Sequence, residues 1–451
     1  MKIQKQVPLT EGPILKSLTG LAVPIMISSF LGTLYNITDM AWIGLLGSKA
    51  VAAVGVGGMY VWLSQGLASL ARMGGQVHVA QCLGRGDKEQ AHRYAKTAVQ
   101  LSILLGLAFA VVSLLFTDPL VAFFKLEGAK TILDAKIYMR ITCGLILFSF
   151  LNLTLTGLYT AQGDSKTPFV ANFIGLLINL LLDPLLILGV GPFPRIEVAG
   201  AAVATVSAQF VVMFVMMVGV FRSKKEENVL KGIRLFEPFS KEELGNICKI
   251  GGPTAIQGMV YCMISMVLTR MVAAFGAEAI ATQRVGGQIE SVSWNTADGF
   301  AAALNAFVGQ NYGAKKMDRV QEGYRISFGT VAIWGALIML AFIIFPGPIA
   351  GVFFHEEKAM EIAISYLIII GFSEAFMCVE LMTIGALSGL GKTKLCSAIS
   401  ITATSMRIPL AMVLSRTSLG LDGIWWALTL TSVAKGIIFY LTFRYQMREK
   451  C

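Results

Sequence analysis

Charged residues are scarce in this sequence. They make up 14% of the 451 residues, whereas a typical soluble domain carries about 25%, and 55% of the residues are hydrophobic. The apolar runs are long and unbroken, unlike the short alternating segments of a membrane β-barrel. The composition therefore indicates an all-α protein that crosses the membrane many times and has little mass outside the lipid bilayer.

Residues that build metal centres, disulfides and catalytic sets are also few. The sequence has three histidines, and its seven cysteines form no C-x-x-C pair. We interpret the cysteines as small apolar residues of the interior. The segment "GLGKTK" (389–394) is an incomplete phosphate-binding loop, because Ala386 stands where the first glycine is needed. We therefore expect no enzyme activity and no cofactor, so that any transport would draw on an ion gradient.

Glycine, proline and charged clusters divide the apolar sequence into candidate transmembrane helices of about 20 residues or more. The length and the spacing of the breaks predict twelve of them. Their ranges are 16–46, 50–83, 93–116, 131–161, 168–190, 197–221, 244–274, 278–312, 320–345, 358–390, 394–415 and 420–446.

Lysine and arginine gather in alternate loops. Most of those between the candidate helices fall on the same side as the two termini, for example Arg85, Lys231 and Lys315. Positive charge favours the cytoplasmic side, so we predict a multi-pass protein of the inner (plasma) membrane with both termini in the cytoplasm. This distribution explains the net charge of +10 without a nucleic-acid partner.

The sequence contains an internal repeat. The shift that places Pro24 on Pro253 also places "VGG" (56–58) on "VGG" (285–287) and "VAQCLG" (79–84) on "VGQNYG" (308–313), without a gap. The repeat unit has six helices, and an even number preserves the orientation of the second copy. We predict two parallel lobes, 1–221 and 244–451, joined by a cytoplasmic linker at 222–243. Two such lobes around a central cleft form an alternating-access architecture.

Two aspartates lie within apolar helices of the first half. Asp39 is in "LYNITDMAWIG" and Asp183 is in "NLLLDPLLI". Asn179 lies one turn before Asp183 on the same face, Pro184 frees the carbonyl four residues earlier, and Thr205 offers a hydroxyl. These oxygens suit a proton or a small hard cation such as Na⁺, and the residues do not decide between the two. The alternative is a buried network that only holds the helices together.

A proline interrupts the first candidate helix. Pro24 lies about four turns before Asp39 and removes one helical hydrogen bond, which allows a kink. We predict that Pro24 is a hinge. The alternative is an ordinary proline of the first helical turn.

The second half does not repeat the aspartates, since Leu268 stands at the position of Asp39. Its acids are elsewhere, and of Glu374 and Glu380 we favour Glu380 as the one that faces a cleft. Acidic and adaptable apolar groups suit a cationic organic molecule. The alternative for the glutamates is structural pairing with Arg284 or Arg407. The residues predicted to form this pocket are Gln288, Glu290, Glu380 and Met382.

Several of these motifs together resemble the multidrug and toxic compound extrusion (MATE) family. They are "LAVPI", "LYNITDMAWIGLLGSKAVAAVGVG", "VAQCLGRGDKEQA", "LDPLLI", "VAGAAVAT", "GAEAIA" and "FVGQNYGAKK", which follow one another along nearly the whole chain. The resemblance implies a MATE/MOP-type fold with twelve helices in two pseudo-symmetric lobes. It also implies cation-coupled export of organic, often cationic, compounds.

Within the family, the aspartate pair resembles the DinF-like branch, because an acid in the seventh helix, typical of the NorM-like branch, is absent. The resemblance implies that the coupling site is formed in the first lobe and that Pro24 is its hinge. It also implies that Tyr138 and Asn152 line the same pocket. The implied coupling residues are Asp39, Asn179, Asp183 and Thr205, of which Asp39, Asn179 and Asp183 would be the metal ligands if the ion is Na⁺.

We therefore expect an H⁺- or Na⁺-coupled antiporter that works as a monomer in the lipid bilayer. Its substrate would be a small drug or metabolite, cationic or amphipathic. A flippase for lipid-linked oligosaccharides, from the same superfamily, is the first alternative, although its pyrophosphate substrate favours a cationic cleft. An intramembrane enzyme such as an acyltransferase is the second, and the small number of histidines argues against it.

Overall fold

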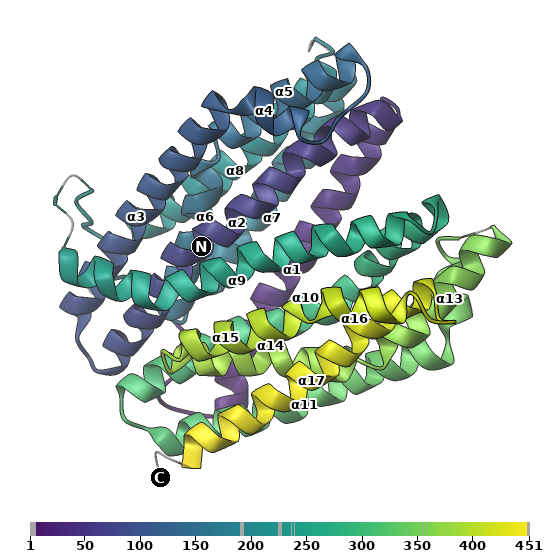
Figure 1. Ribbon diagram of the computed structural model, residues 1–451. Helices are drawn as coiled ribbons and strands as arrows, with labels where there is room; N and C mark the ends of the chain where they lie inside the picture. The colour runs from purple at the N-terminus through teal and green to yellow at the C-terminus, as the bar shows by residue number, and fades with distance from the viewer. Residues whose placement is uncertain are drawn as a thin grey trace. The chain divides into compact units, whose positions relative to one another are not determined.

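The computed structural model describes residues 6–189, 194–223, 228–235, 237–238, 240–354 and 356–448. Over these ranges the chain forms helices, turns and loops without a β-strand, which confirms the all-α prediction. Positions 224–227, 236 and 239 of the predicted linker lie outside the described residues. The helices in Figure 1 are α1 (Ile14–Gly44), α2 (Ser48–Gly84), α3 (Lys88–Leu115), α4 (Thr117–Ala122), α5 (Ala129–Gly144), α6 (Leu147–Ala161), α7 (Lys166–Ile187), α8 (Glu197–Arg222), α9 (Lys241–Ala273), α10 (Ala277–Gly313), α11 (Met317–Ile344), α12 (Pro346–Gly351), α13 (Glu357–Gly371), α14 (Glu374–Gly389), α15 (Thr393–Ser405), α16 (Arg407–Leu414) and α17 (Leu421–Arg448).

Each predicted transmembrane range contains a helix or a broken helix. Two ranges are bent pairs, α5–α6 at 43° and α13–α14 at 50°. A third is interrupted at Met406, because Pro409 has no N–H for the carbonyl of Ser405. By length and composition, the described residues hold nine candidate spans, or up to eleven with the bent pairs. The remaining long helix, α10, has a less apolar sequence that includes Glu290, Asn295 and Asp298.

The internal repeat is confirmed by the bounds of the helices. The shift that places Pro24 on Pro253 also places both ends of α2, α3 and α4 on the ends of α10, α11 and α12. Gly47 and Gly276, which precede α2 and α10, have φ values of 105° and 112°. Only glycine adopts such a backbone without strain, so the sequence match of these glycines has a conformational cause.

In the later part of the repeat, the shift that pairs equivalent residues is one position shorter than the shift that pairs Pro24 with Pro253. Gly163 and Gly391, which this shorter shift pairs, have φ values of 83° and 79°. A Cβ atom at Gly200 would lie 2.6 Å from the carbonyl carbon of Leu186, and one at Gly423 would lie 2.5 Å from that of Leu414. The shorter shift also pairs Leu186 with Leu414, so this register holds along the whole of α7 and of α15–α16.

A tyrosine lies against a glycine at equivalent places in the two repeats. A Cβ atom at Gly57 would lie 2.4 Å from the Tyr138 ring, and one at Gly286 would lie 2.1 Å from the Tyr366 ring. Each glycine therefore makes room for an aromatic ring between two helices. The ring fixes the distance between α2 and α5 in one repeat and between α10 and α13 in the other.

Contacts group the chain into two compact units. Unit 1 comprises Met1–Val7 and Ile27–Gly258, and unit 2 comprises Pro8–Met26 and Met259–Cys451. Both α1 and α9 therefore contribute residues to each unit, and the units differ in this respect from the lobes 1–221 and 244–451. Those lobe boundaries stay a prediction about the repeat.

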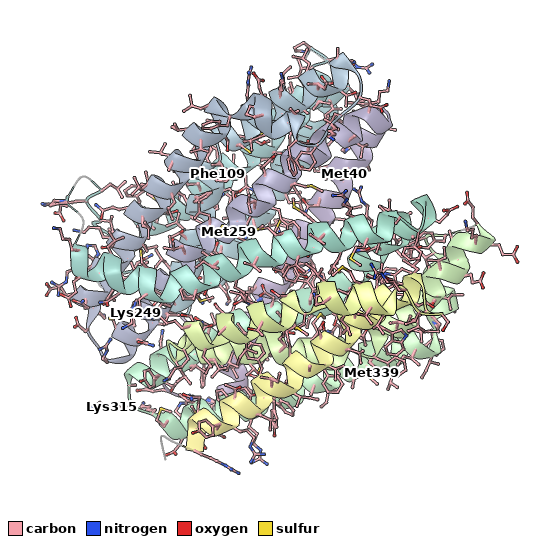
Figure 2. The ribbon with its side chains drawn as sticks, viewed as in Figure 1. Met40, Phe109, Lys249, Met259, Lys315 and Met339 are labelled. Carbon is pink, nitrogen blue, oxygen red and sulfur yellow. The ribbon has the colours of Figure 1, made fainter. Side chains whose placement is uncertain are left out.

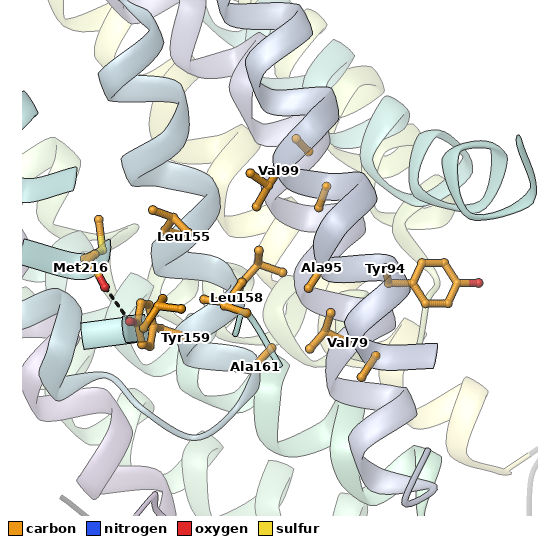
Figure 3. Packing of buried hydrophobic residues seen from close by; sticks show 14 of the residues in the cluster. Val79, Tyr94, Ala95, Val99, Leu155, Leu158, Tyr159, Ala161 and Met216 are labelled. Carbon is orange, nitrogen blue, oxygen red and sulfur yellow. Dashed lines mark hydrogen bonds between the residues drawn. The ribbon is translucent and has the colours of Figure 1, made fainter. Parts of the chain in front are cut away.

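The core of unit 1 is packed from α2, α3, α6 and α8. Val79, Ala95, Val99 and Leu158 belong to its largest buried cluster, which Figure 3 shows. The Tyr159 hydroxyl donates a hydrogen bond of 2.8 Å to the carbonyl of Met216, drawn as a dashed line. This buried bond fixes α6 to α8.

The described part of the predicted linker is attached to α3. The His92 Nδ1 atom lies 2.7 Å from the Val229 carbonyl, and Gln100 Nε2 donates to the Leu235 carbonyl over 2.9 Å. Lys96 Nζ lies 2.7 Å from Glu237 Oε2. The hydrogen bond and the charge of Lys96 hold the pKa of Glu237 below its usual value.

The core of unit 2 contains two apolar clusters. One surrounds the fully buried Trp425 and includes Tyr366 and Leu367. The other includes Leu268, from α9, and Ala411, from α16. Both clusters contain residues of α17 or pack against it, so α17 is central to the unit.

Large apolar side chains remain exposed along the outer helices. Leu181 on α7, Ile333 on α11 and Leu441 on α17 are 62%, 65% and 58% exposed. Figure 2 shows carbon along the middle of the helices and most nitrogen and oxygen toward their ends, as at Lys315. Apolar surface of this extent suits contact with lipid, which agrees with the membrane-spanning prediction.

Candidate functional site

Two buried aspartates meet in unit 1. Asp39, on α1, is 7% exposed, and Asp183, on α7, is fully buried. They are close enough for their charges to interact. Asn179, one turn before Asp183, donates a hydrogen bond of 3.3 Å to Asp183 Oδ1. The structure thus brings Asp39, Asn179 and Asp183 together in unit 1, and their role as a coupling site stays a prediction.

Three oxygens of this cluster have no hydrogen-bond partner among the described residues. They are Asp39 Oδ1, Asn179 Oδ1 and Asp183 Oδ2, and the Thr205 hydroxyl lies beside Tyr35 and Tyr138. Buried oxygens are seldom left without a donor, since each carries a desolvation cost of about 1–3 kcal/mol. Carboxylate, amide and hydroxyl oxygens are ligands that a hard cation prefers, and the same carboxylates can instead take a proton. The donor set thus fits either H⁺ or Na⁺.

Two tyrosines complete the cluster. Tyr35 accepts a hydrogen bond of 3.4 Å from Asn179 Nδ2, and it lies beside Asp39 and Thr205. Tyr138, which is 6% exposed, also lies beside both aspartates. The sequence predicted Tyr138 and missed Tyr35. The missed signal was its spacing, because Tyr35 lies four residues before Asp39 and so on the same helical face.

Asn152, predicted for the same pocket, has other partners. Its Nδ2 atom donates to the carbonyl of Gln209 over 2.9 Å and to Gln209 Oε1 over 2.7 Å. Among the described residues no hydrogen bond joins Asn152 to an aspartate of the cluster. Its observed contact fixes α6 to α8.

Unit 2 contains a second acidic cluster. The Tyr366 hydroxyl donates a hydrogen bond to Glu290 Oε1. Glu374 is 1% exposed, the charge of Glu290 acts on it, and the Ser293 hydroxyl lies beside it. The sequence had favoured Glu380 over Glu374, whereas it is Glu374 that lies beside Glu290.

Glu380 forms a buried ion pair. Its Oε1 atom lies 2.8 Å from Lys435 Nζ, and both residues are 5% exposed. Lys435 is directed to Glu380, which needs a counter-charge in the same apolar surroundings.

The other residues predicted for the second pocket are dispersed. Met382 is fully buried, whereas Gln288 is exposed. Over the described ranges, no hydrogen bond or ion pair joins Glu290 to Gln288 or Glu380. The structure therefore does not bring this set together at one point, and a shared role in substrate binding stays a prediction.

Arg407 lies near the acids of unit 2 without touching them. Its Nε and Nη2 atoms donate to Thr431 Oγ1 over 3.0 Å and to Ser432 Oγ over 2.9 Å. The guanidinium carbon lies 6.0 Å from the centre of the Tyr261 ring. No ion pair of Arg284 or Arg407 with a glutamate occurs in the described chain, so the alternative of direct pairing is not observed.

Comparison with known proteins gives one consistent family. The model of the MatE family matches residues 24–185 and 253–413, one segment in each repeat. "Probable multidrug resistance protein NorM" of Thermotoga maritima is 28% identical over 452 residues, covering 98% of this chain and 95% of that protein. A "FAD transporter" of Shewanella oneidensis is 25% identical over 440 residues, with 96% and 95% covered.

Solved structures share the fold. One described as an "Outward-facing conformation of a multidrug resistance MATE family transporter of the MOP superfamily" has a TM-score of 0.91 at 23% identity, covering 100% of this chain and 99% of that one. A MOP superfamily transporter from Pyrococcus furiosus has a TM-score of 0.90 at 24% identity, with 99% of both chains covered. The predicted MATE/MOP-type fold is thereby confirmed.

Proposed function

The chain belongs to the MatE family, and from this premise we propose that it is an antiporter that exports organic compounds in exchange for H⁺ or Na⁺ by alternating access. The observation that carries the proposal is the pair Asp39 and Asp183, two buried carboxylates with unpartnered oxygens and no fixed cation among their described contacts. Two negative charges in an apolar interior need compensation, which a mobile cation can supply. The cluster can therefore distinguish a loaded from an unloaded state.

The cation would act by changing the charge of unit 1. When H⁺ or Na⁺ binds, Asn179, Thr205 and the aspartates surround a neutral or less charged group, and the polar cluster can close. When the cation leaves, the remaining charge favours contact with water. In this cycle the cation enters from outside, favours release of the substrate to that side, and leaves toward the cytoplasm.

Pro24 is the proposed hinge for this change. It lies inside the continuous helix α1. The residues of α1 up to Met26 belong to unit 2 and those from Ile27 onward belong to unit 1, so Pro24 lies two residues before this change. A proline has no N–H for the helical bond, so bending at this place costs less than elsewhere in α1. The same helix carries Tyr35 and Asp39, which links bending to the state of the cluster.

The substrate class follows from the acids and from the relatives. Acidic groups and partly exposed polar side chains such as Glu290 and Gln288 suit a cationic or amphipathic molecule. The names of the relatives include multidrug resistance proteins and a FAD transporter, and they favour drug or metabolite export over a lipid flippase. The residues proposed to bind the substrate are Tyr138, Asn152, Gln288, Glu290, Glu380 and Met382.

The setting proposed for this activity is the inner membrane of a bacterial cell, with both termini in the cytoplasm and a single chain as the functional unit. The charge distribution of the loops supports the orientation. The DinF-like assignment stays a prediction, because the named relatives include NorM and YoeA proteins.

Transport in proteoliposomes tests the proposal. The purified chain is reconstituted, an H⁺ or a Na⁺ gradient is imposed separately, and transport of a cationic dye and of a flavin is measured. Asp183→Asn should abolish gradient-driven transport of the substrate, whereas Asp318→Asn, a matched change outside the cluster, should not. Wild-type transport by Asp183→Asn would contradict the assignment.

A further inference from the structure

Unit 2 has a fixed cation at a place where unit 1 has a neutral amide. The later register of the repeat, established by Gly163 with Gly391 and by Leu186 with Leu414, places Arg407 at the position of Asn179. Asn179 donates to Asp183 and Tyr35, and its side chain carries no charge. A guanidinium stays protonated at every physiological pH, so Arg407 is a permanent charge.

Arg407 is held in place by neutral groups. It is 8% exposed, and its described hydrogen bonds go to the hydroxyls of Thr431 and Ser432 on α17. The face of Tyr261, on α9, lies 6.0 Å away. Hydroxyls and an aromatic face position a guanidinium without neutralising it, so its charge remains available to the surrounding acids.

The charged groups that act on Arg407, directly or through Glu290, lie on α10, α14 and α17. Glu290 on α10 interacts with its charge, and Glu374 on α14 interacts with Glu290. Lys435 on α17 is also within electrostatic reach, but it is paired with Glu380. Tyr366, on α13, is bound to Glu290. Once the Lys435–Glu380 pair is set aside, Arg407 is the fixed cation of the Glu290–Glu374 cluster.

We propose that Arg407 is a tethered counter-ion of the Glu290–Glu374 cluster and that it lowers by one the number of mobile cations this cluster can take up. Two carboxylates and one guanidinium leave one negative charge, whereas the aspartate pair of unit 1, with Asn179 in the equivalent place, leaves two. In unit 2 the protein thus supplies a cation that unit 1 has to take from solution. The inference uses the proposed coupling site of unit 1 as its contrast, but the charge count in unit 2 stands without it.

Proton uptake by the purified full-length chain tests this count. The background variant Asp39→Asn/Asp183→Asn removes the acids of unit 1, and the protons bound are measured with a pH indicator as an alkaline sample is brought to neutral pH and no further, because at lower pH both carboxylates are protonated with or without Arg407. Adding Arg407→Asn should increase uptake by about one proton per molecule. Adding Arg407→Lys, which keeps the charge, should not, and Glu290→Gln combined with Arg407→Asn should remove the gain.

Two results would overturn the proposal: no gain with Arg407→Asn, or an equal gain with Arg407→Lys. If Arg407→Asn alone does not yield folded protein, the pair Glu290→Gln/Arg407→Asn decides, because it removes one carboxylate together with its cation. The pair should recover most of the yield and melting temperature of the unmodified chain. If the double variant is as unstable as Arg407→Asn alone, Arg407 acts through packing and not through charge, and the proposal is wrong. Asp183→Asn transport tests the proposed function separately.

Discussion

The two units use the same helical arrangement and put their acids on different helices. In unit 1 the acids are on α1 and α7, and the equivalents of Asp39 and Asp183 in unit 2, Leu268 and Ala411, lie in one apolar cluster. In unit 2 the acids Glu290 and Glu374 are on α10 and α14. Their equivalents in unit 1, positions 61 and 146, are a valine and an isoleucine that also belong to one apolar cluster.

This exchange separates the positions that both repeats retain for packing from the polar positions in which they differ. The tyrosines packed on Gly57 and Gly286 are retained, and so are the glycines with positive φ. The polar groups around each tyrosine are not retained. The glycines beneath the tyrosines are retained because a larger residue would not fit, whereas packing places no such demand on the acids.

The largest difference in stability between equivalent contacts of the two units is expected at Lys435. Asn152 and Glu380 are equivalent in the repeat. Asn152 fixes α6 to α8 by an amide hydrogen bond, and Glu380 fixes α14 to α17 by an ion pair. Lys435→Met leaves Glu380 buried without a partner and should cost about 3–5 kcal/mol. Asn152→Ala should cost about 1 kcal/mol. Thermal unfolding in detergent micelles measures both, and equal losses would contradict the difference.

The next largest difference in stability is expected between variants of the two equivalent tyrosines, Tyr366 and Tyr138. Tyr366 donates to a carboxylate, so Tyr366→Phe should destabilise the protein by about 1.5–3 kcal/mol. Tyr138 forms no hydrogen bond of this kind to a carboxylate in the described chain, so Tyr138→Phe should cost less. Melting temperatures of the two variants, compared with Tyr159→Phe as a control in the unit 1 core, test this order.

The glycines beneath these tyrosines should behave alike. Gly57→Ala and Gly286→Ala each put a methyl group within 2.4 Å or less of an aromatic ring. Each should cost about 1–3 kcal/mol through overpacking. Gly58→Ala, where the added Cβ meets nothing within 4 Å, is the matched control. If only one of the two glycines proved sensitive, the repeat would not be equivalent at this place.

The smallest effect is expected at the linker. Glu237→Gln removes the partner of Lys96 at an exposed site, so its effect on melting should be slight. Because Lys96 lowers the pKa of Glu237 in the folded chain, this contribution is present above the ordinary pKa of a glutamate and is lost as the pH falls through the lowered value. The difference in melting temperature between the chain and the variant should therefore vanish in acid.

Much of the fold could be predicted from the sequence because its cause is local. Apolar length predicts a span, and Gly47 and Gly276 mark turns that need positive φ. The lengths of the ranges 131–161 and 358–390 allow a tilt or a kink, but the positions of the bends at α5–α6 and α13–α14 could not be predicted, since neither break contains a proline. The short helices α4 and α12 were missed because they are too short to span a membrane.

The candidate site was predictable where its residues share one helix. Asn179 and Asp183 are four apart, and an acid in an apolar run is conspicuous. The Glu380–Lys435 pair and the position of Arg407 beside Ser432 were not predictable, because they depend on how α14, α16 and α17 are rotated against one another. Sequence spacing contains no information about that rotation.

The central claim is that cation coupling resides in unit 1 and not in its repeat. The most direct test measures how strongly substrate transport in proteoliposomes depends on an imposed cation gradient in Asp39→Asn/Asp183→Asn and in Glu374→Gln. We expect the first variant to lose the dependence and the second to retain it. Retained dependence in the first, or loss of dependence in the second with normal folding, would contradict the claim.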